Sequence, residues 1–186
     1  MARVNYNVVT HGISGKVGDL LQFRQRYGKT IIAKIAAKSS KTSTNQQEIR
    51  DKFKQATAYA KSALKTPELL EIYQKRAAAG VTPYNLALKD FFSTPVIGGV
   101  ELSAYTGAIG STIAVQSSDD TKVAGVTILV YDSSNNLIET GAAAQQGEQD
   151  IWIFTATQFN NDPVGGKVVV EVRDLPGNVS TREFQL

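Results

Sequence analysis

Cysteine is absent from this sequence, and histidine occurs once. The lack of cysteine among 186 residues excludes disulfides, thiolate zinc clusters and thiol catalysis. The single histidine, His11, has no acidic partner at a spacing suited to catalysis or to a metal site. No other nucleophile–base set is evident in the sequence. We therefore expect a protein that is not an enzyme and that uses no cofactor.

Long hydrophobic runs are also missing. No stretch approaches the ~18 apolar residues that a membrane-spanning helix needs, and residues 1–12 lack the apolar core of a secretory signal. We expect a protein made in the cytoplasm without a signal peptide and without a membrane span. A virion or extracellular location would then require lysis or a dedicated export machine.

The two halves of the chain differ strongly in charge. Residues 1–95 hold 16 Lys and Arg against 6 Asp and Glu, whereas residues 96–186 hold 4 against 11. A split of this size predicts two domains with different surfaces, a basic one over 1–95 and an acidic one over 96–186. The basic half suits either a nucleic acid or the acidic half of a second copy.

The first forty residues read as β-structure. Val4, Tyr6 and Val8 alternate with polar residues, which is the period of a half-buried strand. Two further apolar runs flank a glycine turn and predict a hairpin over about 20–36. This hairpin carries Arg24 and Arg26 on one face, with Lys29 at the turn and Lys34 as a possible neighbour. The Gly15-Lys16 pair does not continue as a phosphate-binding loop, because valine follows it.

Three helices are predicted next, over about 44–64, 67–79 and 83–92. Ser43 with Gln46, or Thr44 with Gln47, fits a capping box at the first helix. Apolar residues then recur every three or four positions. Pro67 and Pro83 each follow a threonine, a pattern typical of helix starts, and Gly80 is the expected end of the second helix.

The second half changes to short β-rich runs separated by turn residues. Seven strands in about 90 residues are typical of an immunoglobulin-like or fibronectin-like sandwich. Trp152 is expected in its core, and residues 93–99 are read as the linker. The fold prediction is α+β: an N-terminal hairpin plus helices, followed by this β-sandwich. The seven runs are residues 100–107, 111–118, 123–132, 137–144, 150–157, 167–174 and 180–186.

The predicted sandwich contains one candidate metal site. Asp119 and Asp120 follow the second run and Asp174 follows the sixth, and those loops lie at one end of an immunoglobulin-like sandwich. Three carboxylates there would suit Ca²⁺, which prefers oxygen ligands. Aspartate is also a standard turn residue, however. Calcium is therefore a weak alternative to an expectation of no metal.

Several motifs resemble a known group of proteins. The glycine–lysine hairpin and a Q-x-x-x-R-x-K-F helix, here Gln46, Arg50, Lys52 and Phe53, are similar to short proteins of Bacteroidetes-type bacteria and their phages. The acidic half is similar to immunoglobulin-like modules joined to such chains. The resemblance covers most of the chain and implies an assembly component, but it brings no activity and no catalytic residues.

Together these observations predict a structural or assembly protein that self-associates or decorates a virion, filament or surface structure. The runner-up is a nucleic-acid-associated protein that uses the basic half. We expect homo-oligomers held by the N-terminal arm and by the complementary charged halves. Whether the first strand pairs within its own chain or with a neighbour is open. The candidate interaction residues are Val4, Tyr6, Val8, Arg24, Arg26, Lys29 and Lys34.

Overall fold

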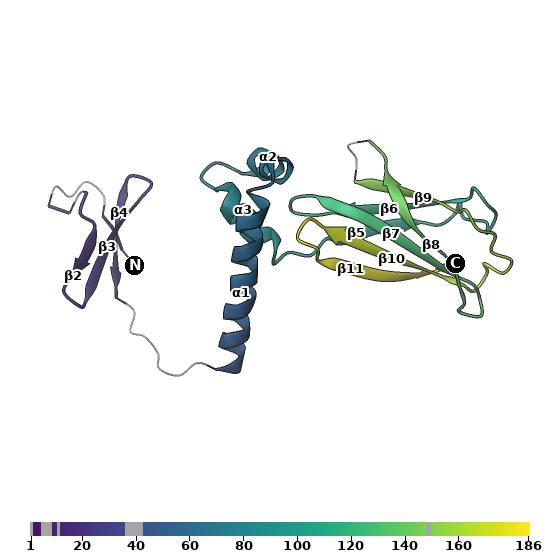
Figure 1. Ribbon diagram of the computed structural model, residues 1–186, viewed down its shortest axis with the longest axis horizontal. Helices are drawn as coiled ribbons and strands as arrows, with labels where there is room; N and C mark the ends of the chain where they lie inside the picture. Colours follow the sequence, from purple (N-terminus) through teal and green to yellow (C-terminus); the bar gives the residue numbers. More distant parts are fainter. Residues whose placement is uncertain (1, 5–8, 11, 36–42, 148–149) are drawn as a thin grey trace. The chain divides into compact units, whose positions relative to one another are not determined.

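The computed structural model describes residues 2–4, 9–10, 12–35, 43–147 and 150–186 (Figure 1). The chain divides into two compact units, Met1–Glu48 and Ile49–Leu186. The first, called unit 1, holds a small sheet. The second, called unit 2, holds the helices and a larger β-rich part. The fold is therefore α+β with a β-rich domain, as the sequence predicts.

Unit 1 contains a four-stranded antiparallel sheet with the strand order β1-β4-β3-β2. The predicted hairpin is confirmed: β3 and β4 pair from Arg26–Lys29 to Leu21–Lys34. Tyr27 and Gly28 both have positive φ, 51° and 70°, as a two-residue hairpin turn with the twist of the strands requires. The strands are β1 Ala2–Val4, β2 Gly15–Val17, β3 Leu21–Arg26 and β4 Lys29–Lys34.

The three helices are α1 Thr44–Ala63, α2 Pro67–Arg76 and α3 Pro83–Asp90. The Ser43–Gln46 alternative for the capping box is confirmed, since each residue's backbone N–H donates to the other's side chain at 3.3 Å. Thr82 also caps α3 as expected, accepting from the backbone N–H of Asn85. The expected end of the second helix at Gly80 is wrong: α2 ends at Arg76, because Ala77 leaves the helical conformation.

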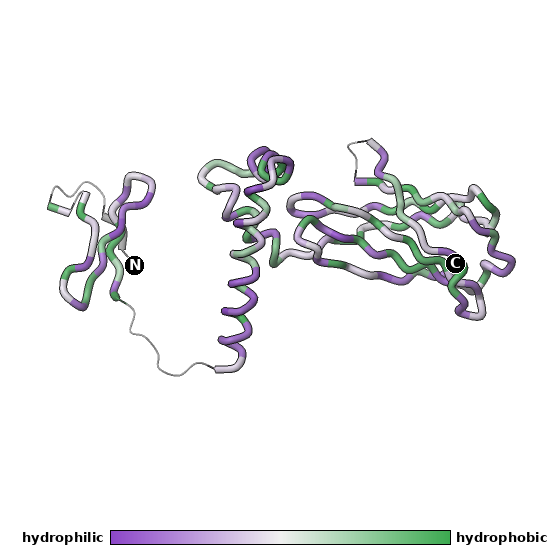
Figure 2. Tube along the Cα trace, viewed as in Figure 1, coloured by the Kyte–Doolittle hydropathy of each residue, from purple (hydrophilic) through white to green (hydrophobic). Residues whose placement is uncertain are grey.

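The helices pack around small residues. Ala56, Ala60 and Ala63 of α1 are buried, and Ala60 and Ala63 form one buried cluster with Ala87 of α3 and the larger Tyr73 of α2. α2 and α3 are short, whereas α1 spans about 30 Å at 1.5 Å per residue. The N-terminal half of α1 therefore extends beyond its partners, and Figure 2 shows that this half is mostly hydrophilic.

Seven strands form the β-rich part in the order β11-β10-β7-β8-β9-β6-β5. β8 pairs with β7 over most of its length and with β9 at Ala144 and Gln145, so it passes from one layer to the other. β5 and β11, at the two ends of this order, also contact each other. The strands are β5 Val96–Glu101, β6 Thr112–Ser118, β7 Val123–Tyr131, β8 Leu137–Gln145, β9 Ile151–Thr155, β10 Lys167–Asp174 and β11 Val179–Gln185.

The first of these strands lies earlier than expected. β5 begins at Val96, within the predicted linker, because Gly98 and Gly99 form an irregularity in the pairing with β6 rather than a hinge. The other six strands match the predicted runs to within a few residues. Buried residues of β6, β7, β9 and β10 belong to one hydrophobic core cluster. Trp152 is confirmed in this core, at 7% exposure.

Polar contacts join the helices to the β-rich part. The side-chain amide of Asn178, in the turn after β10, donates to the carbonyl of Ser93 at 2.7 Å. The hydroxyl of Ser180 donates to the carbonyl of Pro95 at 2.5 Å. The structural division consequently falls near Glu48 rather than at Pro95. That residues 96–186 fold alone stays a prediction.

No helix in the described part of the chain is long and apolar enough to cross a membrane.

Candidate interaction surfaces

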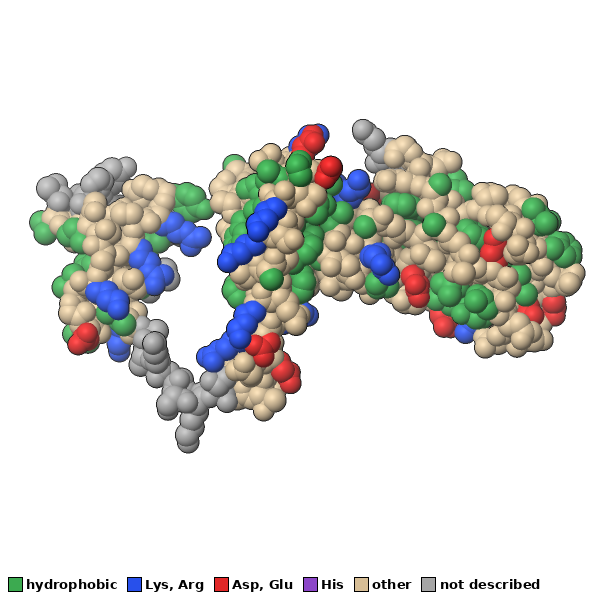
Figure 3. Space-filling view, viewed as in Figure 1, with side chains coloured by type: hydrophobic (Ala, Val, Ile, Leu, Met, Phe, Trp, Pro, Cys, Tyr) green, Lys and Arg blue, Asp and Glu red, His purple; other side chains and the backbone are tan. Residues whose placement is uncertain are grey.

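One face of the unit 1 sheet is basic. Side chains alternate between the two faces of a strand, so Arg24 and Arg26 share a face. The register places Lys29 opposite Arg26 and Lys16 opposite Gln22, on that same face. All four cationic residues are exposed. Figure 3 shows Lys and Arg side chains gathered on this sheet. We call Lys16, Arg24, Arg26 and Lys29 the basic face.

Lys34 does not belong to the basic face, which corrects the expected neighbourhood. The turn at Tyr27–Gly28 fixes the register so that Lys34 lies opposite Leu21. Leu21, Phe23, Ile32 and Lys34 therefore share the other face. The sequence predicts the two strands correctly. The face of the sheet on which each side chain lies also depends on the length of the turn, which sets the register.

Unit 1 by itself covers its apolar side chains poorly. Among its described residues with known burial, only the polar Thr30 is buried. Val17, Leu20 and Leu21 are 56%, 69% and 41% exposed. An isolated sheet of this size normally buries one face against another element. The sheet thus offers an apolar surface as well as a basic one.

The predicted N-terminal strand is found only in part. Val4 ends β1, and its backbone pairs with Thr30 of β4 within the same chain. Tyr6, Val8 and His11 lie outside the described residues. In the single chain, β1 therefore joins the sheet of its own unit 1. β1 and β2 are the edge strands of that sheet.

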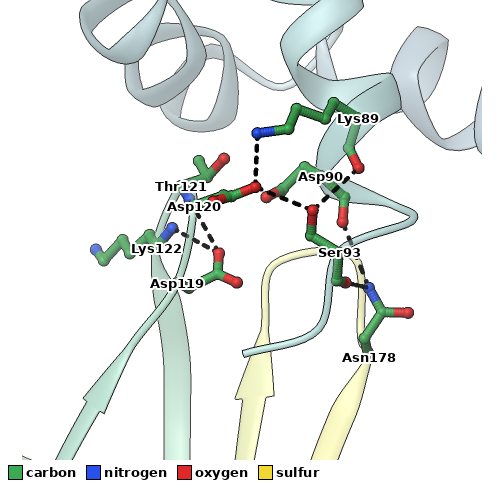
Figure 4. Close-up of polar contacts among 8 residues, drawn as sticks. All are labelled: Lys89, Asp90, Ser93, Asp119, Asp120, Thr121, Lys122 and Asn178. Atoms are coloured by element: carbon green, nitrogen blue, oxygen red, sulfur yellow. Dashed lines mark hydrogen bonds and ion pairs between the residues drawn. The ribbon is translucent and has the colours of Figure 1, made fainter. Parts of the chain in front are cut away.

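The three carboxylates considered for calcium do lie at one end of the β-rich part, where α3 meets it. Asp119 accepts hydrogen bonds from the backbone N–H groups of Thr121 and Lys122 (Figure 4). Asp120 pairs with Lys89 at 2.8 Å and accepts from the hydroxyl of Ser93 at 3.0 Å. Both carboxylates therefore organise the turn and its contact with α3.

Asp174 has a similar structural role in the next turn. It is 1% exposed and accepts from the backbone N–H groups of Gly177 and Asn178, at 2.8 and 2.6 Å. Burial raises the pKa of its carboxyl, and these hydrogen bonds counteract the rise in part. Within the described residues, no group of three histidine, cysteine or acidic side chains is arranged to hold a metal ion. The hydrogen bonds of Asp119 and Asp174 to backbone N–H groups are those of turn-forming aspartates.

A buried polar chain at the helical end escaped the sequence analysis. The hydroxyl of Tyr73 in α2 donates to the carboxylate of Asp90 in α3 at 2.7 Å. The hydroxyl of Tyr59 in α1 lies 2.8 Å from that of Tyr73 and donates to it, because the hydroxyl hydrogen of Tyr73 is already engaged in the bond to Asp90. Burial raises the pKa of Asp90 and of both tyrosines. In the sequence, only the spacing of apolar residues around Tyr59 and Tyr73 indicates that these two side chains face the helical core.

Two pockets in the described part of unit 2 carry no recognisable reaction chemistry. A pocket of about 440 Å³ lies between α2 and the loops of the β-rich part, and it is lined by Lys75, Arg76 and Lys122 together with Asp119 and Asp150. Its charges are mixed, so it favours neither a cation nor an anion. A second, of about 350 Å³, lies on the outer face of β5, β6 and β9. Neither joins a nucleophile to a base.

Comparisons with protein-family models, curated proteins and solved structures find no match to this chain. The function must therefore be argued from the surfaces themselves.

Proposed function

We propose that this protein is a structural subunit of an assembly of several copies. The observation that carries the proposal is the uncovered sheet of unit 1, which buries no large apolar side chain among its described residues of known burial. A sheet this small is marginal without a covering surface. A neighbouring subunit supplies that cover in the assembly, whether this is a virion, a filament or a surface structure.

Charge favours a second copy as the partner. Residues 1–48 hold 8 Lys and Arg against 2 Asp and Glu, whereas residues 96–186 hold 4 against 11. The basic unit 1 of one copy is attracted to the acidic β-rich part of the next. Copies joined through unlike surfaces form rings or filaments, according to whether the rotation closes.

The β-rich part is proposed to be an immunoglobulin-like module of this subunit. The pairings of β5 with β6, β6 with β9, β7 with β10 and β10 with β11 support this, because they separate the strands into two layers as in such sandwiches. The polar contacts of Asn178 and Ser180 hold it to the helices. We assign it the role of a spacer or decorating domain.

Sedimentation velocity of the full chain, over a wide range of concentration, tests the proposal. We expect association at low salt that weakens at high salt, because screening shortens the range of charge attraction from about 10 Å at 0.1 M to about 3 Å at 1 M. Replacing Arg24 and Arg26 with Gln should weaken association by about tenfold or more. Replacing Lys61 and Lys65 of the helical region with Gln is the matched control. A wild-type protein that stays monomeric under all these conditions would refute the proposal.

Nucleic-acid binding is the second candidate, and the basic face favours it. Four exposed cations on one side of a sheet can follow a phosphate backbone. Fluorescence anisotropy with labelled DNA and RNA provides the test. If this function is right, replacing Arg24 and Arg26 with Gln removes about two phosphate contacts. The slope of log affinity against log salt should then become less steep by about 0.9 for each contact. Equal, weak binding by wild type and variant would exclude the basic face as a nucleic-acid binding site.

A further inference from the structure

Unit 2 exposes apolar side chains in two separate places. Ten of its large apolar side chains are exposed among the described residues, and seven of these gather at two surfaces. The first, called the helix patch, consists of Ile49, Phe53 and Phe92. The second, called the loop tip, consists of Ile109, Leu137, Phe159 and Val164.

The helix patch continues the packed stripe of α1 into solvent. Ile49 and Phe53 are followed at spacings of three and four by Ala56, Ala60 and Ala63, which are buried. Ile49 and Phe53 remain 68% and 51% exposed, since α2 and α3 are too short to cover them. The ring of Phe92 stacks on Phe53, with centroids 6.5 Å apart.

Cations surround this patch. Residues 48–54 contain Arg50, Lys52 and Lys54 against Glu48 and Asp51, and Lys54 pairs with Asp51 at 3.1 Å. The ammonium of Lys52 lies 5.7 Å from the centre of the Phe92 ring. Figure 3 shows the Lys and Arg side chains along α1. The charges oppose the pairing of two helix patches with each other.

The loop tip lies at the end of the β-rich part that is remote from the helices (Figure 1). Its three loops are joined by backbone hydrogen bonds, from Asn160 to Gly107 at 2.8 Å and from Ser133 to Asp162 at 3.2 Å. They thus present one ordered surface. The loops, residues 102–111, 132–136 and 157–166, contain Asp132 and Asp162 but no Lys or Arg. Two loop tips therefore repel each other.

We infer that the loop tip of one copy docks on the helix patch of a second copy. Each surface carries exposed apolar side chains, and the net charges beside the two are opposite in sign, so the unlike pair is favoured over either like pair. The contact involves unit 2 alone and adds to the contact proposed for unit 1. It rests on the proposed function, since the partner is again this chain.

Mixing two blocked variants tests this contact. Phe53→Glu disables the helix patch and leaves the loop tip intact, whereas Phe159→Glu does the reverse. Each variant alone should associate at least about tenfold more weakly than wild type, as expected for an aromatic anchor. Mixed together, they should pair one to one through this contact, in addition to any contact through unit 1, because one intact patch then meets one intact tip. Val81→Glu, at an exposed site outside both surfaces, is the matched control.

Each outcome in sedimentation velocity has a defined meaning, once circular dichroism shows that all variants are folded. Restoration of the pair in the mixture supports the contact. Variants that associate like wild type overturn it, and so does a mixture that associates no better than its components. A wild-type protein that never associates refutes the proposed function itself, which separates the two failures.

Discussion

Two glycines near the same strand pair show how differently single positions constrain this fold. Gly166 directly precedes β10, and an added Cβ would overlap the backbone carbonyl oxygen of Tyr131. Gly125 in β7 has open space around its Cα and no positive φ. We predict that Gly166→Ala lowers the free energy of unfolding by about 1–3 kcal/mol, because backbone atoms must shift. Gly125→Ala should be neutral or up to about 1 kcal/mol stabilising.

Urea unfolding of both glycine variants measures this difference. The Gly125 variant is the control, because it makes the same glycine-to-alanine change at a site with open space. Equal effects at the two positions would show that the close approach to Tyr131 is not a constraint.

Trp152 anchors the β-rich core, but its indole N–H has no hydrogen-bond partner among the residues that the structure describes. Trp152→Ala should lower the free energy of unfolding by about 3–5 kcal/mol through the cavity it creates. Trp152→Phe should cost clearly less, because it also removes an unpaired buried donor. Chemical denaturation checks both values. A loss below about 1 kcal/mol for the alanine variant would place the ring at the surface, against its burial here.

At the scale of elements, the contact between helices and β-rich part should respond to pH. The buried carboxylates Asp90 and Asp174 have raised pKa values, with burial as the largest cause. Beside burial, the hydrogen bond from Tyr73 and the charges of Asp119 and Asp174 act on the pKa of Asp90. A raised folded-state pKa gives stability that is complete below the unfolded value of about 3.9 and is lost as pH rises through the folded value.

Asp90→Asn is therefore predicted to flatten the pH dependence. The amide oxygen can still accept from Tyr73, but no charge is left to bury. The free energy of unfolding of the variant should fall less than that of wild type as pH rises above about 4. Urea titrations at a series of pH values give both curves. Parallel curves would mean that Asp90 does not titrate in this range. Asp120, whose pKa Lys89 lowers, acts in the opposite direction, but it is exposed and screened.

The elements themselves were largely predictable from sequence, and their contacts were not. The helix starts at Ser43, Pro67 and Pro83 depend on local capping residues, and the later strands depend on local alternation of apolar and polar residues. The sequence therefore predicted both. β2 was missed because its three residues include a glycine and are too few for a pattern. The buried chain through Tyr73 and Asp90 joins residues 17 positions apart, which no local period reveals.

At the scale of the whole molecule, the charge split was visible in sequence, but its surfaces were not. The register of the hairpin decides that Arg24 and Arg26 lie with Lys29 and away from Lys34. The exposed end of the α1 stripe appears only once the lengths of α2 and α3 are known. The residue types of the candidate surfaces were therefore predictable from the sequence. Which of these residues lie side by side is known only from the fold.

Hydrogen exchange of the β3 and β4 amides at increasing protein concentration tests the central claim most directly. If a neighbouring copy covers the unit 1 sheet, these amides should exchange more slowly as concentration rises, because the sheet opens less often when covered. Amides in β7 and β10, at the centre of the β-rich core, should be unaffected. Exchange in β3 and β4 that does not change with concentration, up to the highest attainable, would contradict the assembly role.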